Sequence, residues 1–193
     1  MIELVPESYV AVLDLEEIFG RRAPLHVDLG CGDGTFLSAM AAHFPEKNFL
    51  GIDRLTGRVA KSCRRATEQP NARVLHLETT YAVRYLFAEG SVETFYLLFP
   101  DPWPKRRHHR RRIFTSDFLD AVHRALAAGG TLRVATDQVD YFRQIIATSR
   151  ADPRFAIADE VEVDLPKTKF ERRFEAAGAP IYGLVLRKLS PVM

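Results

Sequence analysis

The fold is decided by one stretch, Leu25-His26-Val27-Asp28-Leu29-Gly30-Cys31-Gly32-Asp33-Gly34, in which a short apolar segment runs into a loop of alternating glycines. Residues 25–29 have the length and apolar content of a buried strand. Beyond Gly34, apolar side chains recur at helical spacing at Phe36, Leu37, Met40, Ala41 and Phe44. Glycine tolerates positive φ and lets a ligand approach the backbone closely. The stretch therefore predicts a strand, a ligand-binding turn and a helix.

Strand and helix patterns alternate along the rest of the chain. Further strands are predicted over 48–52, 73–77, 95–99 and 131–135, and helices over 56–67, 81–87, 115–128 and 141–149. Gly129-Gly130 is predicted to end the helix over 115–128. Two long strands, 155–165 and 181–187, then flank an insertion that contains Gly and Pro. The pattern predicts one doubly wound α/β domain, with a mostly parallel seven-stranded sheet and an antiparallel strand at its C-terminal end.

The composition is that of a globular domain whose positive charge is clustered. The chain has 193 residues, 47% of them hydrophobic, and a net charge of +2, so it is not a general polycation. Six of its 27 Lys and Arg residues lie between Lys105 and Arg112, which favours an anionic partner, with a solvated loop as the alternative. Cys31 and Cys63 have no metal-like spacing, which indicates a reducing compartment and no metal site.

We expect a cytoplasmic protein. No apolar stretch approaches the roughly 20 residues that span a bilayer, so no membrane contact is expected. The N-terminal residues 1–7 carry two acids and no basic segment, unlike a signal peptide. The sequence does not distinguish a monomer from a homodimer.

Acidic residues lie at or just beyond the carboxyl ends of three of the predicted strands. Asp28 precedes a G-x-G-x-G loop, where a phosphate site would offer cations, so Asp28 and Asp33 favour a cationic or amine-bearing ligand. Asp53 ends the next strand, at the position that binds ribose hydroxyls in Rossmann-type folds. Glu78 ends the third strand, where it would either receive an adenine amino group or cap the next helix. The glycine spacing differs from the G-x-G-x-x-G of NAD sites, which makes NAD the second choice.

A second loop follows the strand predicted over 95–99. It reads Leu98-Phe99-Pro100-Asp101-Pro102-Trp103-Pro104-Lys105; residues 98–105 are here named the proline loop, and residues 105–112 the basic run. Proline lacks a backbone donor and restricts the residue before it, so Asp101 and Trp103 are expected on a stiff, extended loop. Trp103 either stacks on a base or packs against its own loop. His108 and His109 are expected to contact backbone or solvent rather than to act in catalysis.

These residues resemble known methyltransferases. The glycine loop and its acids resemble the S-adenosylmethionine pocket of class I methyltransferases, and Asp101-Pro102-Trp103 is similar to the D/N/S-P-P-aromatic motif of enzymes that methylate exocyclic amines of adenine or cytosine. Longer motifs resemble the tRNA (guanine-N7)-methyltransferase family over about residues 25–188. They are residues 99–105 followed by Arg107-His108 and Arg111-Arg112, then Thr136-Asp137, and then Thr168-Lys169-Phe170-Glu171 followed by Arg173.

The resemblance implies a fold, a reaction and a set of site residues. The fold would be the Rossmann-like class I methyltransferase fold in one domain over 1–193, with an N-terminal segment (1–24), cofactor-binding units (25–150) and a C-terminal strand pair with a substrate motif (151–193). The reaction would transfer a methyl group from S-adenosylmethionine to N7 of guanine in tRNA, at position 46 of the variable loop. The cofactor would contact Asp28, Gly30, Gly32, Gly34, Asp53, Glu78 and Asp101, of which Asp101 would also be catalytic. The substrate would contact Lys105, Asp137, Thr168, Lys169, Phe170 and Glu171.

The chemistry of that reaction agrees with the residues present. Guanine N7 carries an in-plane lone pair and no proton, so the transfer needs no base, and alignment of the reactants supplies much of the rate. Asp101 or Asp137 would stabilise the developing positive charge or hydrogen-bond the guanine edge. A non-catalytic RNA-binding module is disfavoured by the intact acids at 28, 53 and 101. A small-molecule methyltransferase is disfavoured by the basic run.

Three features depart from the family pattern. Residues 78–86 lack the usual D-A pair, which leaves open whether Glu78 or Thr80 contacts the adenine. Arg172-Arg173-Phe174 lacks the glycine that commonly follows the second arginine of the motif. Only 27 residues precede Asp28, so a shorter N-terminal arm is expected to hold tRNA less extensively.

Overall fold

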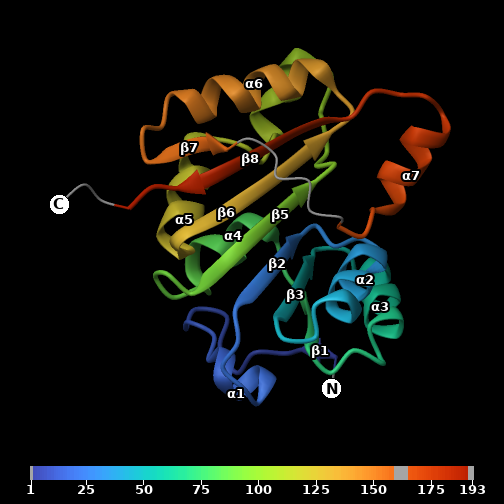
Figure 1. The fold of residues 1–193 in the computed structure, drawn as a ribbon, viewed down its shortest axis with the longest axis vertical. Coiled ribbons are helices and arrows are strands. Elements are labelled where there is room, and N and C mark those ends of the chain that lie inside the picture. Colours follow the sequence, from blue (N-terminus) through green and yellow to red (C-terminus); the bar gives the residue numbers. More distant parts are fainter. Residues whose placement is uncertain (1, 159–164, 191–193) are drawn as a thin grey trace.

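The computed structural model describes residues 2–158 and 165–190, which form a twisted sheet with helices packed on both faces (Figure 1). The strands are β1 (Glu3–Leu4), β2 (Leu25–Leu29), β3 (Asn48–Asp53), β4 (Ala72–His76), β5 (Val92–Leu98), β6 (Leu126–Thr136), β7 (Phe155–Ala158) and β8 (Tyr182–Lys188). The helices are α1 (Leu15–Phe19), α2 (Thr35–His43), α3 (Thr56–Arg65), α4 (Thr79–Tyr85), α5 (Ser116–Ala125), α6 (Val139–Arg150) and α7 (Lys169–Ala176), with a 3-10 helix, η1, over Arg106–Arg111.

The strand order places the functional loops at one edge of the sheet. The order is β1-β4-β3-β2-β5-β6-β8-β7, and only β8 runs antiparallel to its neighbours β6 and β7. The chain builds outward on one side of β2 and then returns to build outward on the other, so the strand order reverses between β2 and β5. Ligands bind outside the carboxyl ends of strands at such a switch point. The predicted doubly wound, mostly parallel sheet is confirmed.

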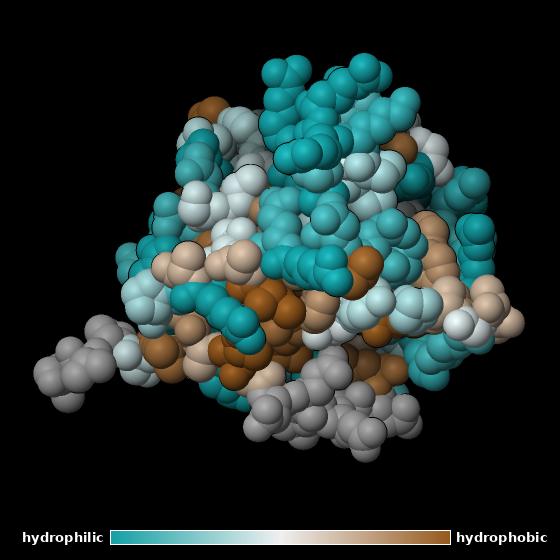
Figure 2. All heavy atoms as spheres, turned by 90° about the horizontal axis from the view of Figure 1, so that it is seen from above, coloured by the Kyte–Doolittle hydropathy of each residue, from teal (hydrophilic) through white to brown (hydrophobic). Residues whose placement is uncertain are grey.

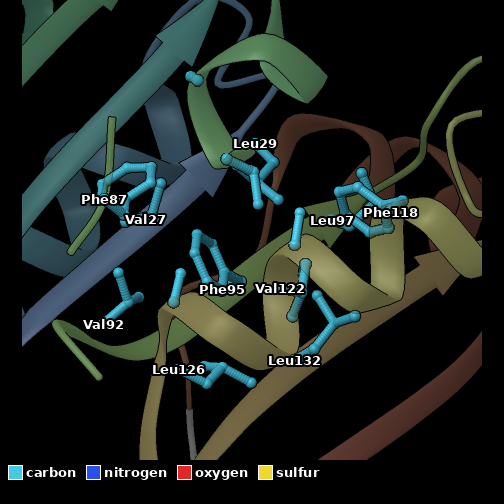
Figure 3. Packing of buried hydrophobic residues seen from close by; sticks show 14 of the residues in the cluster. Val27, Leu29, Phe87, Val92, Phe95, Leu97, Phe118, Val122, Leu126 and Leu132 are labelled. Carbon is cyan, nitrogen blue, oxygen red and sulfur yellow. The ribbon is translucent and has the colours of Figure 1, made fainter. Parts of the chain in front are cut away.

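Alternation along the strands produces a core on each face of the sheet. Val27 and Leu29 of β2, with Phe95 and Leu97 of β5, pack against α4 and α5 (Figure 3). The opposite face of β5 presents Tyr96, which belongs to a second cluster with residues of α2 and α3. Residues 25–29 are all buried, as expected for a strand covered on both faces.

The helix predicted over 115–128 is three residues too long. It ends at Ala125, and β6 begins at Leu126, which pairs with Val92 of β5. Gly129 and Gly130 therefore lie within the strand, where the pairing shifts register between Val92 and Thr94. Gly129 has a φ of 70°, and a Cβ on Gly130 would lie 2.9 Å from the Glu93 carbonyl oxygen. The two glycines accommodate this irregular pairing rather than ending a helix, because the apolar pattern of α5 continues into the strand.

Other differences lie near the termini. Glu3–Leu4 adds β1 beside β4, so the sheet within the described ranges has eight strands rather than the seven predicted. The strand predicted over 155–165 ends at Ala158 as far as the structure describes it, with 159–164 outside the described residues. The insertion before β8 contains α7, which was not among the predicted helices.

No helix among the described residues has the length and apolar character needed to cross a membrane. Seen from above in Figure 2, hydrophilic residues cover most of the surface, and hydrophobic ones gather in a smaller area toward the lower edge of the view.

Candidate active site

A cleft of about 630 Å³ opens at the carboxyl ends of β2, β3 and β5. Its wall combines two regions that are far apart in the sequence. Gly30 and Glu78 come from the loops that follow β2 and β4, and Asp53 is the last residue of β3, while the proline loop contributes its stretch from Leu98 to Asp101 and Trp103. The structure thus brings Gly30 of the glycine loop, two of the strand-end acids and Asp101 to one cavity, while Asp28, Gly32 and Gly34 do not line it.

The glycine loop has the conformation that its sequence requires. Gly30, Gly32 and Gly34 have φ values of 83°, 58° and 76°, a region that side chains other than glycine rarely adopt. At Gly34 a Cβ would lie 2.6 Å from the Cα of Ser62, so this glycine also permits the close packing of α2 against α3. The backbone amides of Gly30 and Cys31 donate to the Ile52 carbonyl, which fixes the loop beside Asp53.

Asp28 and Asp53 form a pair of buried carboxylates under the glycine loop. Asp28 is 6% exposed and Asp53 3% exposed. Burial, with the charge of Asp53 adding to it, raises the pKa of Asp28 to about 7. Asp53 accepts hydrogen bonds from the amides of Gly32 (3.1 Å) and Leu55 (2.9 Å), whereas no described residue donates one to the Asp28 side chain. A bound cationic group would favour the ionised form of Asp28, which agrees with the predicted ligand class.

Asp33, the second acid of the loop, is engaged within the protein. Its carboxylate accepts from the amide and hydroxyl of Thr35 and pairs with Arg65 at 3.1 Å. Burial alone would raise the pKa of Asp33, but the hydrogen bonds from Thr35 and the charge of Arg65 lower it below its ordinary value. The role of Asp33 toward a cationic ligand stays a prediction, and in this conformation Arg65 is the cation beside its carboxylate.

Glu78 caps a helix and also lines the cleft. Its two carboxylate oxygens accept from the amides of Thr80 (3.0 Å) and Tyr81 (2.7 Å) at the start of α4, the usual arrangement of an N-cap. Thr79 and Thr80 line the same wall. Each carboxylate oxygen keeps a second lone pair, so capping and contact with a ligand are compatible, and both Glu78 and Thr80 stay candidates.

The proline loop is strained rather than simply extended. Phe99 and Trp103 have φ values of 53° and 44°, which few residues other than glycine adopt, and each costs roughly 1–3 kcal/mol. Trp103 contacts the adjoining basic run, because its ring lies 5.9 Å from the His108 ring and 4.9 Å from the Arg111 guanidinium. Of the two predicted roles for Trp103, these contacts favour packing. Asp101, between the two strained residues, is exposed in the cleft wall.

Arg112, the last cation of the basic run, is buried. Its guanidinium donates to the Pro102 carbonyl (2.8 Å), Gln144 Oε1 (2.7 Å) and Asp140 Oδ2 (3.1 Å), and it lies 4.7 Å from the Tyr141 ring. The side chain is 3% exposed. The expectation that the whole basic run faces an anionic partner is therefore wrong at Arg112, which connects the proline loop to α6.

The predicted substrate residues occupy three places. Lys105 is exposed and precedes η1. Asp137 follows β6, accepts from Gln138 Nε2 at 2.6 Å, and lies outside the cleft wall. Thr168 and Glu171 form a capping box at the start of α7, which leaves Lys169 and Phe170 exposed. The Phe170 ring lies 5.8 Å from the Phe99 ring, so α7 packs on the proline loop.

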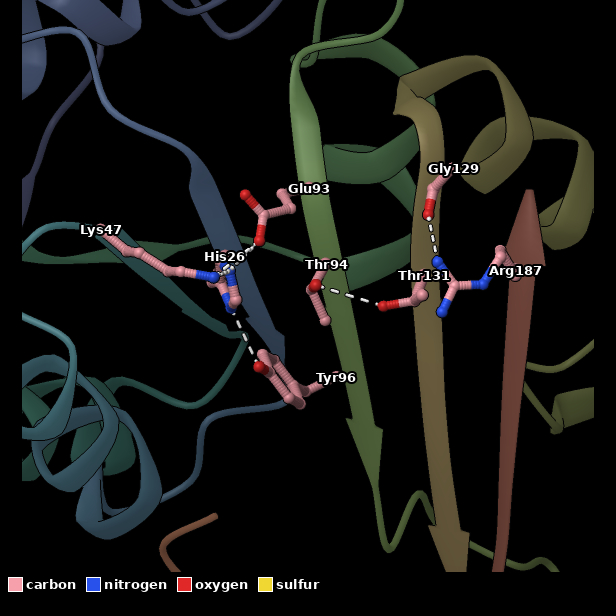
Figure 4. A network of polar contacts seen from close by, with 8 residues as sticks. All are labelled: His26, Lys47, Glu93, Thr94, Tyr96, Gly129, Thr131 and Arg187. Atoms are coloured by element: carbon pink, nitrogen blue, oxygen red, sulfur yellow. Dashed lines mark hydrogen bonds and ion pairs between the residues drawn. The ribbon is translucent and has the colours of Figure 1, made fainter. Parts of the chain in front are cut away.

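A separate polar network lies closer to the amino ends of the strands (Figure 4). His26 contacts the Tyr96 hydroxyl (2.9 Å) and Glu93 (3.2 Å), and Lys47 pairs with Glu93 at 2.7 Å. Burial and the charge of Lys47 lower the pKa of His26 to about 4, so this histidine is neutral at physiological pH. None of these residues lines the cleft, and their contacts connect β2, β5 and the segment before β3.

Comparison with known proteins identifies the family. A family model described as "Putative methyltransferase" matches residues 22–184. A tRNA (guanine-N(7)-)-methyltransferase of Halorhodospira halophila is 40% identical, over 95% of this chain and 82% of its own length. The chain belongs to the tRNA (guanine-N(7)-)-methyltransferase family. A relative with the same name from Leifsonia xyli is 38% identical, over 92% of this chain and 82% of its own length.

Solved structures show the fold at larger evolutionary distance. The 16S rRNA methyltransferase KamB has a TM-score of 0.64 at 18% identity, with 93% of this chain and 95% of that chain covered. An rRNA methylase of Streptococcus thermophilus has a TM-score of 0.58 at 13% identity, with 87% of this chain and 88% of that chain covered. The family resemblance and the class I methyltransferase fold inferred from the motifs are both confirmed.

Proposed function

We propose that this protein transfers the methyl group of S-adenosylmethionine to N7 of guanine in tRNA, at position 46 of the variable loop. The observation that carries the proposal is the shared cleft, in which Asp101 of the proline loop lies in the same wall as Gly30 and Asp53. Membership of the tRNA (guanine-N(7)-)-methyltransferase family gives the acceptor. Because the relatives modify tRNA, we also propose that the protein acts in the cytoplasm.

The residues under the cleft fit this cofactor. S-adenosylmethionine supplies an electrophilic methyl group on a sulfonium, and it also carries an ammonium group. Asp28 is a buried carboxyl that lies beside Asp53 and has no cationic partner among the described residues, so it suits the ammonium end. Asp53 has lone pairs beyond its two backbone hydrogen bonds and is assigned to the ribose hydroxyls. Gly30, Gly32 and Gly34 let the backbone approach the cofactor, and Glu78 or Thr80 receives the adenine.

Asp101 is assigned the catalytic position. Guanine N7 has no proton to lose, so the residues around it need only orient the base and respond to the positive charge that develops on the ring. An exposed carboxylate in the cleft wall fits both tasks. Arg112 donates to the carbonyl of Pro102, next to Asp101, and such contacts offset the strain at Phe99 and Trp103. We assign them the role of positioning Asp101 before the base arrives, which favours methyl transfer.

The substrate residues are assigned to the RNA side of the cleft. Lys105 lies at the start of the exposed cations and suits a phosphate near the target base. Thr168 and Glu171 cap α7 through each other, and we propose that this cap presents Lys169 and Phe170 to the RNA. Asp137 is assigned to the guanine edge, which requires the Gln138 amide to release it or to share it.

Nucleoside mass spectrometry tests the proposal directly. A tRNA transcript with guanosine at position 46 is incubated with the protein and S-adenosylmethionine, beside a matched transcript that carries adenosine there. We expect N7-methylguanosine from the first transcript and none from the second. Equal yields from both would place the modification elsewhere. Methylation of adenine or cytosine would overturn the guanine assignment and favour the exocyclic-amine chemistry that Asp101-Pro102-Trp103 also resembles.

A further inference from the structure

Cations form a stripe along the exposed side of α3. Arg58, Lys61 and Arg65 follow one another at intervals of three and four residues, which places them on one face of the helix. Arg54 lies in the loop just before α3, and Arg64 adjoins the stripe. The opposite face is buried through Val59 and Ser62. Residues 54–65 thus carry five cations and no Asp or Glu, in a chain whose net charge is only +2.

The fold uses only part of this charge. Arg65 pairs with Asp33 at 3.1 Å, and Arg58 lies 3.7 Å from Asp53, so these two cations offset the acids of the glycine loop. Arg54, Lys61 and Arg64 are exposed, and no acidic side chain in the described ranges pairs with any of the three. Within residues 2–158 and 165–190 their charge contributes no ion pair, and we take it to be available to an external anion.

The stripe reaches the site of the proposed reaction. Arg54 and Arg58 line the same cleft as Arg110 and Arg111 of the basic run. Since β3 and β5 flank β2 in the sheet, the two sets of cations lie on opposite sides of the cleft. A polyanion that delivers a base into the cleft would present phosphates to both sides.

We propose that the α3 stripe is a second phosphate-binding surface, so that the tRNA backbone crosses the cleft between α3 and the basic run. The inference rests on the proposed function, because it takes tRNA as the anion. It assigns the affinity for RNA to two elements instead of one, and it assigns Lys61 and Arg64 a role in binding but none in chemistry. Both residues lie farther along α3 than Arg54 and Arg58, outside the cleft wall.

The test is the salt dependence of tRNA affinity in a double variant, Lys61→Ala with Arg64→Ala. Each phosphate contact contributes roughly 0.7–0.9 to the slope of log K against log salt, so losing two should reduce the slope by about 1.4–1.8 and weaken binding about 25- to 60-fold at 0.1 M salt. Affinity for S-adenosylmethionine and kcat at saturating tRNA should equal those of the parent. The matched control is Arg22→Ala with Arg150→Ala, which removes the same charge. Both control residues are exposed and lie toward the amino ends of the strands, because Arg22 precedes β2 and Arg150 ends α6 before β7.

Three outcomes decide the inference. A flatter slope in the α3 variant, with the control pair matching the parent, supports it. An unchanged slope in the α3 variant, with N7-methylguanosine still formed, overturns the second surface and leaves the proposed function standing. A parent protein that neither binds tRNA nor methylates it overturns both. A variant that fails to fold would lose cofactor affinity too, and Lys61→Gln with Arg64→Gln, which removes both charges but keeps longer side chains, then repeats the test with the same flatter slope expected.

Discussion

Replacing Arg112 tests whether the proline loop is held in place from α6. Arg112→Ala removes three hydrogen bonds, of which those to the Pro102 carbonyl and Gln144 lie in part-buried surroundings. Hydrogen bonds that involve a charged group contribute about 1.5–3 kcal/mol each. The third partner, Asp140, is 71% exposed, so that ion pair adds little.

We therefore expect Arg112→Ala to lower the free energy of unfolding by about 3–5 kcal/mol. For a protein of 193 residues, this corresponds to a fall in Tm of roughly 6–20 °C. Without the contact at Pro102, Asp101 should lose its fixed position, and a misplacement of about 1 Å can cost on the order of 100-fold in kcat. Arg112→Lys keeps the charge but not the planar fork, so it should recover little of either loss.

The assay compares thermal unfolding, kcat and the salt dependence of tRNA affinity across Arg112→Ala, Arg112→Lys and Arg110→Ala. Arg110 is the matched control, because it lies on η1 and removes the same charge but is exposed. We expect the Arg110 variant to change the salt slope and to leave Tm and kcat at saturating tRNA near parent values. We expect the Arg112 variants to lower Tm and kcat and to leave the salt slope near its parent value. Kinetics are measured well below the lowest Tm. If Arg112→Ala matched Arg110→Ala in all three measurements, the buried contacts would not position the loop.

The remaining predictions concern the acids of the cleft. Asp53→Ala should weaken S-adenosylmethionine binding about 2- to 150-fold, as expected for one or two lost hydrogen bonds, with tRNA binding retained; calorimetry that shows parent affinity would remove Asp53 from the site. Asp101→Asn should lower kcat far more than tRNA affinity, and equal losses in single-turnover and binding assays would favour Asp137 instead. Because the pKa of Asp28 is raised to about 7, its contribution to stability is fully present below pH 4 and is lost as the pH rises through 7. Asp28→Asn should therefore raise the free energy of unfolding by up to about 4 kcal/mol at pH 8 and by less at pH 5, while abolishing tight cofactor binding. Urea unfolding at the two pH values measures this, and a gain equal at both would refute the raised pKa.

The elements around the glycine loop could be predicted because the apolar runs, the glycines and the alternation of strands and helices all indicate the same structure there. The strand over 25–29 has the bounds of β2, and the glycines needed for positive φ mark the turn unambiguously. In the C-terminal part, around residues 168–171, the sequence signals were not interpreted together. The capping box of Thr168 and Glu171 is a helix start signal, but we interpreted 168–171 only as a substrate motif and so missed α7.

Strained and buried polar residues were harder to predict because their environment comes from distant segments. Phe99 has a positive φ that no sequence rule indicates, since an aromatic residue ordinarily avoids it. Its ring packs on Phe170 and Phe174 of α7, more than 70 residues later in the chain. The proline spacing indicated stiffness correctly but not the direction in which the loop turns.

The basic run shows most clearly that charge in a sequence does not determine which cations are buried and which are exposed. Nothing in the sequence of the run distinguishes one of its six Lys and Arg residues from the others. In the structure Arg112 is the one that hydrogen-bonds to α6, through Asp140 and Gln144, which lie 28 and 32 residues away in the chain. The Arg111 guanidinium lies over the Trp103 ring. Lys105, Arg106, Arg107 and Arg110 are exposed and have no acidic partner among the described residues. With four phosphate contacts instead of six, the run would contribute about 2.8 rather than 4.2 to the salt slope, so a larger total slope in the parent protein would require further cations such as those of α3.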